Sequence, residues 1–299
     1  MMTIGIVPNT SKPNIWKIVK ILVQKLENAG LNFLISESIM DSEYTGDQKL
    51  NGAVLLDHDE LFEQSDVVIS IGGDGTMLNT AFETRKTETP LIGINYGKLG
   101  FLAEFDINNI DSLVNSLKKG NFIVEERMVL EGFCREDLDE DLYAINDIVI
   151  DRGRWPKMIE MEVRADDEYV STFSADGIII ATPTGSTGYS LSTGGPIVNP
   201  KADVITLSPI SPHTLTMRPL VLASSQKICI TARSLHTTIQ VICDGQRVNY
   251  FKPPTTIEIY KSKRHIKLVH TKNNNYFEIL RNKLFWGLDI RANKKSDEV

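Results

Sequence analysis

The chain has 299 residues, of which 41 % are hydrophobic and 24 % are charged. A chain of this length holds about two domains, and this balance is typical of a globular protein and excludes a disordered one. The formal net charge is −7 at pH 7, from 32 Lys+Arg against 39 Asp+Glu. An acidic balance argues against binding to nucleic acid, although backbone N–H groups and a metal ion can still hold a phosphate group.

The cysteines and histidines give no disulfide framework and no metal site. Cys134, Cys229 and Cys243 have no C-x-x-C spacing, so we expect reduced thiols in a cytoplasmic protein. The five histidines form no H-x-H or H-E-x-x-H pair, so we expect no metal site built from histidines and assign no protein side chain as a metal ligand. Because no apolar run approaches ~20 residues and no signal segment is visible, we expect no membrane span and no secretion.

The first third of the chain alternates between strand and helix patterns. In chain order we first expect a strand at Thr3–Val7 and a helix between a Ser11 cap and Gly30, whose apolar face is Ile15, Ile18, Val19, Leu22 and Leu26. Strands follow at Asn32–Ile35 and Val67–Ile71, and then a helix marked by Leu78, Ala81 and Phe82. The series ends with a strand at Leu91–Ile94 and a helix marked by Ile110, Leu113 and Leu117. Residues 36–60 are polar and acidic, and we expect little regular structure there. The order β-α-β-α predicts an α/β domain with a doubly wound parallel sheet.

The pattern changes near Asn121, beyond which short strands dominate. We expect strands at Met128–Cys134, Ala144–Ile150, Met158–Arg164, Tyr169–Phe173, Gly177–Ala181, Val204–Leu207, Lys227–Ala232, Thr238–Cys243, Thr256–Tyr260 and Ile266–His270. Such a series predicts a β-rich, sandwich-like domain. An amphipathic helix is predicted over Tyr276–Gly287 and needs a surface on which to dock. We therefore expect an α/β domain from residues 1–124 plus 271–299, and a β-rich domain from residues 125–270.

The first chemical motif is Gly72-Gly73-Asp74-Gly75-Thr76, at the end of a predicted buried strand. Open α/β sheets bind ligands at the carboxyl ends of their strands. Glycines let the backbone approach a phosphate, and the start of a helix adds its positive dipole end. A carboxylate repels phosphate, so Asp74 points to work on a hydroxyl group, as a general base, or to a Mg²⁺ ion. The alternative is that the motif is only a tight turn.

The second motif is residues 176–196, where a predicted buried strand leads into a loop rich in glycine and hydroxyl groups. The hydroxyl-bearing residues are Thr182, Thr184, Ser186, Thr187, Tyr189, Ser190 and Ser192. Many neutral hydrogen-bonding groups suit a ligand with many hydroxyl and amide groups, such as a nucleoside. Alternatively, the loop is a helix N-terminus with redundant caps. No G-x-x-x-x-G-K-[ST] motif is present, which excludes a P-loop nucleotidase.

Three shorter features are ambiguous by themselves. Asn146-Asp147 either points into a cleft or ends an edge strand. Phe101 follows a glycine-rich turn and is either a core residue or an aromatic lid over a base. Asp244-Gly245-Gln246 has the pattern of a hairpin turn.

Together these segments resemble the NAD kinase family, in whose order they occur. The matching segments are Gly72–Thr76, Asn95–Phe105, Asn146-Asp147, Asp176–Pro196, Ser211–Leu220, Asp244-Gly245 and Phe277–Gly287. The resemblance implies ATP-dependent phosphorylation of the adenosine-ribose 2′-hydroxyl of NAD to give NADP. It also implies Mg²⁺ or another divalent cation, and a homo-oligomer that is a dimer or tetramer. The C-terminal helix is then expected to return to the α/β domain.

The resemblance also implies roles for single residues. Asp74 is the carboxylate that contacts the sugar, and Asn146 and Asp147 hold ribose hydroxyls. The other positions implied for NAD are Thr187, Tyr189 and Ser192 around the adenine and its ribose, Phe101 close to the adenosine, Asp176 near the nicotinamide end, and Gly75, Gly188 and Asp244. The implied phosphate site is Gly72, Gly73, Gly75 and Thr76. Two positions depart from the family: Gly188 replaces a common Ala, and Ser174-Ala175 leaves the choice between NAD and NADH open.

Two other functions remain as alternatives. A lipid kinase of the diacylglycerol or sphingosine type carries a similar glycine loop. However, the chain lacks an evident apolar or basic membrane-facing segment, and its hydroxyl-rich loop suits a nucleoside better. A non-catalytic NAD(H) sensor would use the same pocket, but a pure binder does not need the Asp74 carboxylate.

Overall fold

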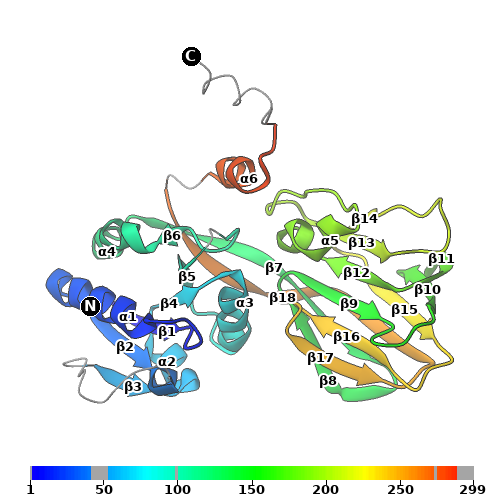
Figure 1. The fold of residues 1–299 in the computed structure, drawn as a ribbon, viewed down its shortest axis with the longest axis horizontal. Helices are drawn as coiled ribbons and strands as arrows, with labels where there is room; N and C mark the ends of the chain where they lie inside the picture. The colour runs from blue at the N-terminus through cyan, green and yellow to red at the C-terminus, as the bar shows by residue number, and fades with distance from the viewer. Residues whose placement is uncertain (1, 42–52, 98–99, 273–274, 288–299) are drawn as a thin grey trace. The chain divides into compact units, whose positions relative to one another are not determined.

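The structure of this chain is a computed structural model that describes residues 2–41, 53–97, 100–272 and 275–287. It divides into two compact units, each with its own apolar core. Unit 1 comprises Met1–Thr80, Thr89–Glu125 and Leu268–Val299, and unit 2 comprises Ala81–Glu88 and Glu126–Lys267. Helix α3 (Asp74–Glu83) and strands β7 (Phe122–Cys134) and β18 (Thr255–Thr271) pass from one unit into the other (Figure 1).

Unit 1 is built on a parallel sheet in the order β3-β2-β1-β4-β5. Its strands are β1 (Thr3–Pro8), β2 (Asn32–Ser36), β3 (Val54–Leu56), β4 (Val67–Gly72) and β5 (Leu91–Asn95), and β5 also pairs with the short β6 (Phe105–Asp106) and with the end of β18. The predicted doubly wound sheet is confirmed. The strand order reverses between β1 and β4, and such a switch point is where open α/β sheets bind ligands.

Helices cover both faces of this sheet. They are α1 (Ile15–Ala29), α2 (His58–Gln64), α3 and α4 (Ile110–Lys119), with 3-10 turns at Glu37–Asp41, Thr84–Lys86 and Ile107–Asn109. The alternation of β1 explains the arrangement, since Ile4 and Ile6 join the core formed with α1 and α4. Gly5 lies between them and faces α2, where a Cβ would come within 2.7 Å of the Leu61 side chain.

Two expectations for unit 1 were wrong. Ser11 does not cap α1, because the helix begins after Asn14, and the Ser11 hydroxyl instead donates to Asn9 Oδ1 at 2.7 Å. The polar stretch 36–60 contains a 3-10 turn, β3 and the start of α2. A strand of three residues is too short to show alternation, and α2 depends on a local cap, in which Asp57 accepts the N–H of Glu60 at 2.9 Å. Residues 42–52 of that stretch lie outside the described residues.

Unit 2 is a sandwich of antiparallel strands, as predicted. One sheet has the order β14-β13-β12-β9-β16-β17. Its strands are β9 (Asp147–Asp151), β12 (Gly177–Ala181), β13 (Val204–Ile210), β14 (Leu220–Ala223), β16 (Ile239–Cys243) and β17 (Arg247–Phe251). The other strands are β8 (Asp137–Ala144), β10 (Ile159–Ala165), β11 (Glu168–Ala175) and β15 (Ile228–Arg233), with β7 and the first part of β18.

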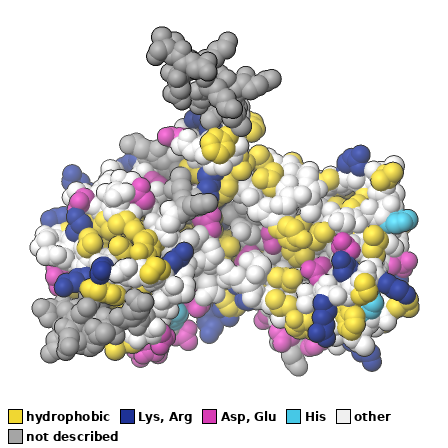
Figure 2. All heavy atoms as spheres, viewed as in Figure 1, with side chains coloured by type: hydrophobic (Ala, Val, Ile, Leu, Met, Phe, Trp, Pro, Cys, Tyr) yellow, Lys and Arg dark blue, Asp and Glu magenta, His cyan; other side chains and the backbone are white. Residues whose placement is uncertain are grey.

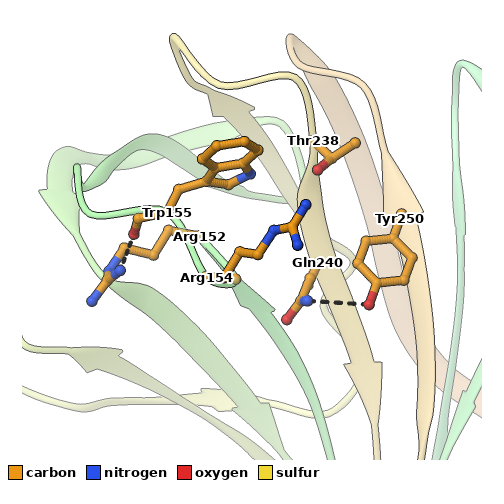
Figure 3. A pocket seen from close by; sticks show the side chains of 7 residues that line it. Arg152, Arg154, Trp155, Thr238, Gln240 and Tyr250 are labelled. Carbon is orange, nitrogen blue, oxygen red and sulfur yellow. Dashed lines mark hydrogen bonds between the residues drawn. The ribbon is translucent and has the colours of Figure 1, made fainter.

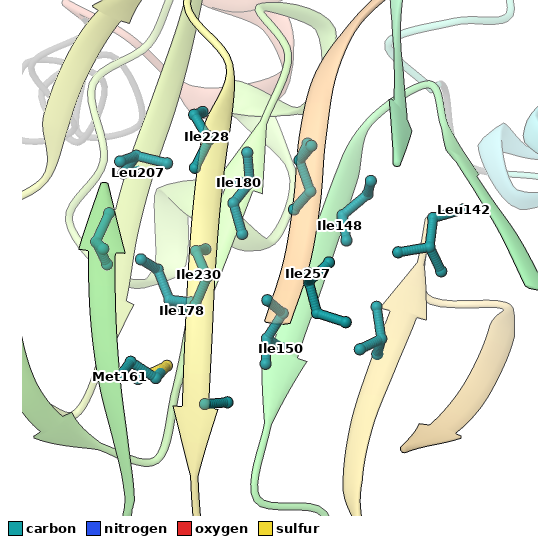
Figure 4. Close-up of a cluster of buried hydrophobic side chains, with 14 of the residues drawn as sticks. Leu142, Ile148, Ile150, Met161, Ile178, Ile180, Leu207, Ile228, Ile230 and Ile257 are labelled. Carbon is teal, nitrogen blue, oxygen red and sulfur yellow. The ribbon is translucent and has the colours of Figure 1, made fainter. Parts of the chain in front are cut away.

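The unit 2 core lies between the inner faces of these sheets. Alternate residues of β9 and β12, such as Ile148 and Ile178, meet Ile230 and Ile257 from β15 and β18 (Figure 4). These side chains are at most 1 % exposed. Burial of each contributes roughly 1.5–3 kcal/mol relative to exposure, so this core holds the two sheets together.

The strand limits in unit 2 differ from prediction in two places. The expected strand Ala144–Ile150 is broken, because β8 ends at Ala144 and β9 begins at Asp147. The expected strands Thr256–Tyr260 and Ile266–His270 are one continuous strand, β18. Strands β8, β14 and β17 were not predicted.

The C-terminal helix α6 (Tyr276–Leu284) forms part of unit 1. It stops short of the predicted Gly287, because Phe285 takes a left-handed φ of 53°. No helix among the described residues is long and apolar enough to cross a membrane. On the face drawn in Figure 2, basic and acidic side chains are interspersed.

Candidate functional site

The Gly72–Thr76 segment lies at the switch point of the unit 1 sheet. Strand β4 ends at Gly72, and α3 begins at Asp74. At the end of the neighbouring β1, Asn9 donates from Nδ2 to Thr76 Oγ1 at 2.8 Å. The segment therefore joins the carboxyl ends of two parallel strands to the positive end of a ten-residue helix. The sequence did not indicate Asn9, because its link to the motif exists only as this tertiary contact.

The glycines of this segment serve a different purpose from the one expected. Neither Gly72 nor Gly73 takes a left-handed φ, so the turn itself does not require glycine. A Cβ at Gly72 would lie 2.6 Å from Thr76 Cβ, whereas a Cβ at Gly73 would meet nothing within 4 Å. Gly72 is therefore needed for close packing, and Gly73 faces open space that can admit a ligand.

The Asp74 carboxylate is held by the backbone of a second loop. Its two oxygens accept the N–H groups of Phe101 at 2.8 Å and Leu102 at 3.1 Å. A Cβ at Gly100 would run into this carboxylate, which explains the glycine there. Each carboxylate oxygen keeps a second lone pair. Asp74 is thus fixed in orientation and still able to accept a further proton or hydrogen bond.

Phe101, another predicted site residue of unit 1, is half-buried, and its N–H donates to this carboxylate. Its ring lies 5.1 Å from Lys283 Nζ of α6, at cation–π distance. The Phe101 side chain is thus not fully buried in the core, and its ring is not free of contacts as a lid over a base would be.

Asn95 is a polar residue of unit 1 that was not singled out from the sequence. It ends β5 and is the register partner of Gly72. Its side chain is 3 % exposed and donates to the carbonyl of Gly97 at 3.3 Å. Within the part of the chain that the structure describes, Asn95 Oδ1 has no hydrogen-bond partner. A buried acceptor without a donor is costly, so this oxygen is available to a ligand.

In unit 2, the backbone of the Asn146-Asp147 pair is held by hydrogen bonds to the Asp244 carboxylate. Asp244, Gly245 and Gln246 connect β16 to β17, and Asp244 and Gly245 take left-handed φ values of 54° and 67° in a turn closed by the N–H of Gln246 donating to the carbonyl of Cys243 at 3.1 Å. The Asp244 carboxylate accepts the N–H groups of Ile145, Asn146 and Asp147 at 3.0, 2.6 and 3.3 Å. These bonds replace the ladder pairing that the predicted strand would have needed. They also favour a positioning role for Asp244 over direct contact with a ligand.

Asp147 itself is buried, with 6 % of its surface exposed. Burial, and secondarily the charge of Asp244, raises the pKa of Asp147 to about 7. A Cβ at Gly188 would lie 3.8 Å from Asp147 Oδ2 and 4.0 Å from Asn146 Nδ2. Asn146, Asp147 and Gly188 are therefore neighbours, as predicted residues of one site should be.

The hydroxyl groups of the second motif divide into two sets. The buried set makes bonds within the protein: Thr182 donates to the carbonyl of Ile145, Ser186 donates to that of Pro183, Thr184 accepts from Arg127, and Ser190 bonds to Ser208. Tyr189 and Ser192, in the short helix α5 (Tyr189–Ser192), are exposed, whereas Thr187 in the 3-10 turn Thr184–Thr187 is half-buried and its hydroxyl donates to the carbonyl of Thr184 at 3.3 Å. The buried hydroxyls thus stabilise the loop from within, and the side chains of Tyr189 and Ser192 remain accessible to solvent.

Asp176 lies between β11 and β12 and is paired with a cation that the sequence did not indicate. Arg152 Nε lies 2.6 Å from Asp176 Oδ1. Arg152 also lines a cavity of about 280 Å³, together with Gly153, Arg154, Trp155, Thr238, Gln240 and Tyr250 (Figure 3). The guanidinium offsets the negative charge that Asp176 would present alone.

Comparison with known proteins decides the family. The model of the ATP-NAD kinase N-terminal domain matches residues 4–122, and that of the C-terminal domain matches residues 145–271. The NAD kinase of Chlorobium luteolum is 37 % identical over 287 residues, covering 96 % of this chain and 98 % of that protein. The chain belongs to the NAD kinase family. The NAD kinase of Geotalea daltonii is 36 % identical over 289 residues, covering 96 % of this chain and 99 % of that protein.

Solved structures of this family have the same fold. The NAD kinase from Archaeoglobus fulgidus in complex with ATP has a TM-score of 0.74 at 27 % identity, covering 95 % of this chain and 99 % of that one. Yeast NADH kinase complexed with NADH has a TM-score of 0.87 at 23 % identity, covering 97 % and 89 % of the two chains. The α/β and β-rich organisation is thus that of NAD kinases.

Among the residues that the structure describes, no group of three or more His, Cys, Asp or Glu side chains could hold a metal ion. The three cysteines are buried and free. The side-chain oxygens of Asp74 and Asn95, both in unit 1, are hard donors of the kind that Mg²⁺ prefers.

Proposed function

We propose that this protein is an ATP-dependent NAD kinase that phosphorylates the adenosine-ribose 2′-hydroxyl of NAD to give NADP. Membership of the family supports the activity. The observation that carries the chemistry is the Asp74 carboxylate, which is fixed by two backbone N–H groups at the start of α3 and retains free lone pairs. A sugar hydroxyl is a weak nucleophile at neutral pH and needs such a base.

Asp74 acts as the general base. Its carboxylate takes the proton of the 2′-hydroxyl while the sugar oxygen forms a bond to the γ-phosphorus of ATP. The bond from that phosphorus to the β,γ-bridging oxygen breaks, and ADP leaves with the electron pair. Phosphoryl transfer depends mainly on positioning and charge neutralisation, so the fixed orientation of Asp74 is its main asset.

The phosphates of ATP bind at Gly72, Gly73, Gly75 and Thr76. The open space beside Gly73 and the N-terminus of α3 support this assignment. A bound divalent cation would neutralise charge on the phosphate oxygens, and we assign Asn95 Oδ1 as a protein oxygen available to it or to its water shell. No Walker lysine is present to share that task.

The nucleoside parts of NAD bind to polar groups of unit 2. Asn146 and Asp147 bond to ribose hydroxyls, and Thr187, Tyr189 and Ser192 contact the adenine and its ribose. The exposure of Tyr189 and Ser192 supports this, because buried hydroxyls of the loop such as Thr182 and Ser186 are already bonded within unit 2. We also assign Gly75, Gly188 and Phe101 to NAD. Asp176 lies at the nicotinamide end, with its charge offset by Arg152.

We further propose a cytoplasmic homo-oligomer, a dimer or tetramer. The edge strands of the six-stranded sheet support it, since Leu220 and Val221 of β14 are 39 % and 45 % exposed, and Val248 and Tyr250 of β17 are 42 % and 61 % exposed. Exposed apolar edges are usually covered in native assemblies. Light scattering of the purified protein tests this, and a monomer at micromolar concentration would contradict it.

The activity is tested by a substrate panel with γ-labelled ATP and Mg²⁺. NAD, NADH, diacylglycerol and sphingosine are offered separately, and polyphosphate replaces ATP in a second series. We expect labelled NADP from NAD and no labelled lipid. Labelled lipid would favour the lipid kinase alternative. Calorimetric binding of NAD without NADP formation would favour the sensor.

A further inference from the structure

Arg247 is a half-buried cation that is bonded to Asp244, the residue whose carboxylate holds the Asn146-Asp147 pair. Its Nη2 donates to Asp244 Oδ2 at 2.7 Å and to the carbonyl of Tyr143 at 3.1 Å. The Asp244 side chain is 0 % exposed and that of Arg247 is 21 % exposed. A carboxylate removed from water in this way requires a cation, and Arg247 supplies it.

The guanidinium of Arg247 is itself held by an aromatic ring. Its Cζ lies 4.0 Å from the centroid of Phe82, and Arg85 Cζ lies 3.8 Å from the same ring. Tyr143 meets Phe82 edge to face, with centroids 5.7 Å apart. Phe82 belongs to the last turn of α3, the helix that begins with Asp74. The ring and the carbonyl of Tyr143 together restrict Arg247 to an orientation facing Asp244.

A relay of contacts follows from these positions. Phe82 orients Arg247, Arg247 neutralises Asp244, and Asp244 binds the N–H groups of Asn146 and Asp147. Each link is within hydrogen-bonding or stacking distance. None of these groups except the Asn146-Asp147 pair needs to touch a substrate.

We propose that Arg247 is a positioning residue for the kinase reaction, which acts through Asp244 to hold Asn146 and Asp147 in the arrangement that binds NAD. This inference rests on the proposed function. It assigns to Arg247 an effect on NAD and none on ATP, because its hydrogen bonds go to Asp244 and to the carbonyl of Tyr143, and Asp244 holds the Asn146-Asp147 pair.

The relay also has an electrostatic consequence. The charged or titratable groups that bear on Asp147 are Asp244 from the hairpin turn and Cys243 at the end of β16. Arg247 offsets the charge of Asp244. Without Arg247 the uncompensated Asp244 makes ionisation of Asp147 harder and raises its pKa further. Loss of Arg247 is therefore expected to move the acidic limb of the pH profile of kcat/KM for NAD to higher pH.

The test compares Arg247→Met with Arg247→Lys, which keeps the charge, and with Arg85→Met as a matched control. Arg85 packs on the same ring of Phe82 but is not bonded to Asp244. For each variant, kcat, the KM of NAD, the KM of ATP and the pH profile of kcat/KM for NAD are measured. Circular dichroism and thermal unfolding establish that each variant is folded.

We expect Arg247→Met to raise the KM of NAD about 10-fold or more, to leave the KM of ATP within about twofold, and to move the acidic limb to higher pH. Arg247→Lys should restore the limb, and Arg85→Met should resemble the wild type. A folded Arg247→Met protein with an unchanged KM for NAD and an unchanged pH profile would overturn the inference. If Arg247→Met does not fold, Arg247→Gln replaces it. An unchanged KM for NAD together with an unchanged pH profile in Arg247→Gln would then overturn the inference.

The proposed function can fail separately. If the wild type makes no NADP from NAD and ATP, the activity is wrong whatever Arg247 does. Calorimetric titration with NAD then still decides the inference, because a 10-fold weaker Kd for Arg247→Met supports it and an equal Kd overturns it.

Discussion

The carboxylates of Asp147 and Asp244 are buried in the same part of unit 2, where the N–H of Asp147 donates to Asp244 Oδ1 at 3.3 Å. Asp244 is neutralised by Arg247 and by several N–H groups, whereas Asp147 has no cation paired with it among the described residues. Burial and the charge of Asp244 raise the pKa of Asp147 to about 7. The site thus contains one structural carboxylate and one whose charge depends on pH near neutrality.

The raised pKa of Asp147 makes stability depend on pH. The folded protein binds this proton more tightly than the unfolded chain, whose carboxyl has the ordinary value of 3.8. The stability gained is fully present below pH 3.8 and is lost as the pH rises to about 7. Asp147→Asn removes the cost of the ionised carboxylate, so the ligand-free variant should be more stable than the wild type above pH 7, by up to roughly 4 kcal/mol.

Urea unfolding at pH 5, 6.5 and 8 measures this difference. The advantage of Asp147→Asn should be largest at the highest pH and should shrink toward pH 5. Asp111→Asn serves as control, since the Asp111 side chain is 72 % exposed. A difference that does not change with pH would show that Asp147 titrates normally.

The same titration should affect substrate binding. An ionised Asp147 accepts hydrogen bonds from ribose hydroxyls, and a protonated one accepts them poorly. The KM of NAD should therefore fall as the pH rises through about 7, while the KM of ATP changes little. Steady-state kinetics between pH 5.5 and 8.5 measure both constants. A flat profile for NAD would remove Asp147 from the binding site.

Tyr189→Ala should mainly weaken NAD binding. The ring is 47 % exposed and is free to cover the adenosine part of the substrate. Stacking of a base on an aromatic ring is worth ~1–3 kcal/mol, so the Kd of NAD should rise roughly 10-fold. Tyr169→Ala is the matched control, because Tyr169 of β11 is 60 % exposed and lies outside the predicted site. A kinetic defect with an intact Kd would contradict this role.

Gly72→Ala and Gly73→Ala should have opposite effects. At Gly72 the new methyl group would press on the Thr76 side chain, so stability should fall by about 1–3 kcal/mol. At Gly73 the methyl group meets no protein atom within 4 Å, so the fold should survive. If phosphates occupy that space, Gly73→Ala should raise the KM of ATP about 10-fold or more. Thermal unfolding and steady-state kinetics separate the two, and a stable Gly73→Ala protein with a normal KM for ATP would remove Gly73 from the phosphate site.

The general plan of the fold could be predicted because its signals are local. Buried strands such as Val67–Ile71 are continuous apolar runs, and Gly30 and Gly120 end their helices in left-handed conformations. The prediction failed where a distant residue overrides local pattern. The run Ala144–Ile150 has the composition of one strand, and it is broken by a carboxylate from Asp244, which is 98 residues away from Asn146.

In the candidate site, too, residues with a local sequence signal could be predicted and residues that act through distant contacts could not. Asp74 could be proposed from the sequence, because an acidic residue stands among glycines after a strand. Arg152, Arg247, Asn9 and Asn95 were missed, because each matters only through a tertiary contact or an unpaired atom. The hydroxyl-rich loop could be predicted only in part. Its composition predicted polar contacts, but only the folded backbone separates Ser186, which is bonded internally, from Ser192, which is exposed.

The central claim is that Asp74 is the general base of an ATP-dependent NAD kinase. The most direct measurement is NADP formation by the wild type and by Asp74→Asn, with the Kd of NAD measured for both. Asp57→Asn is the matched control, because Asp57 also accepts a backbone N–H at a helix N-terminus. We predict that Asp74→Asn binds NAD nearly normally and loses ~10²-fold or more in turnover. Unchanged turnover in Asp74→Asn, or no NADP from the wild type, would contradict the account.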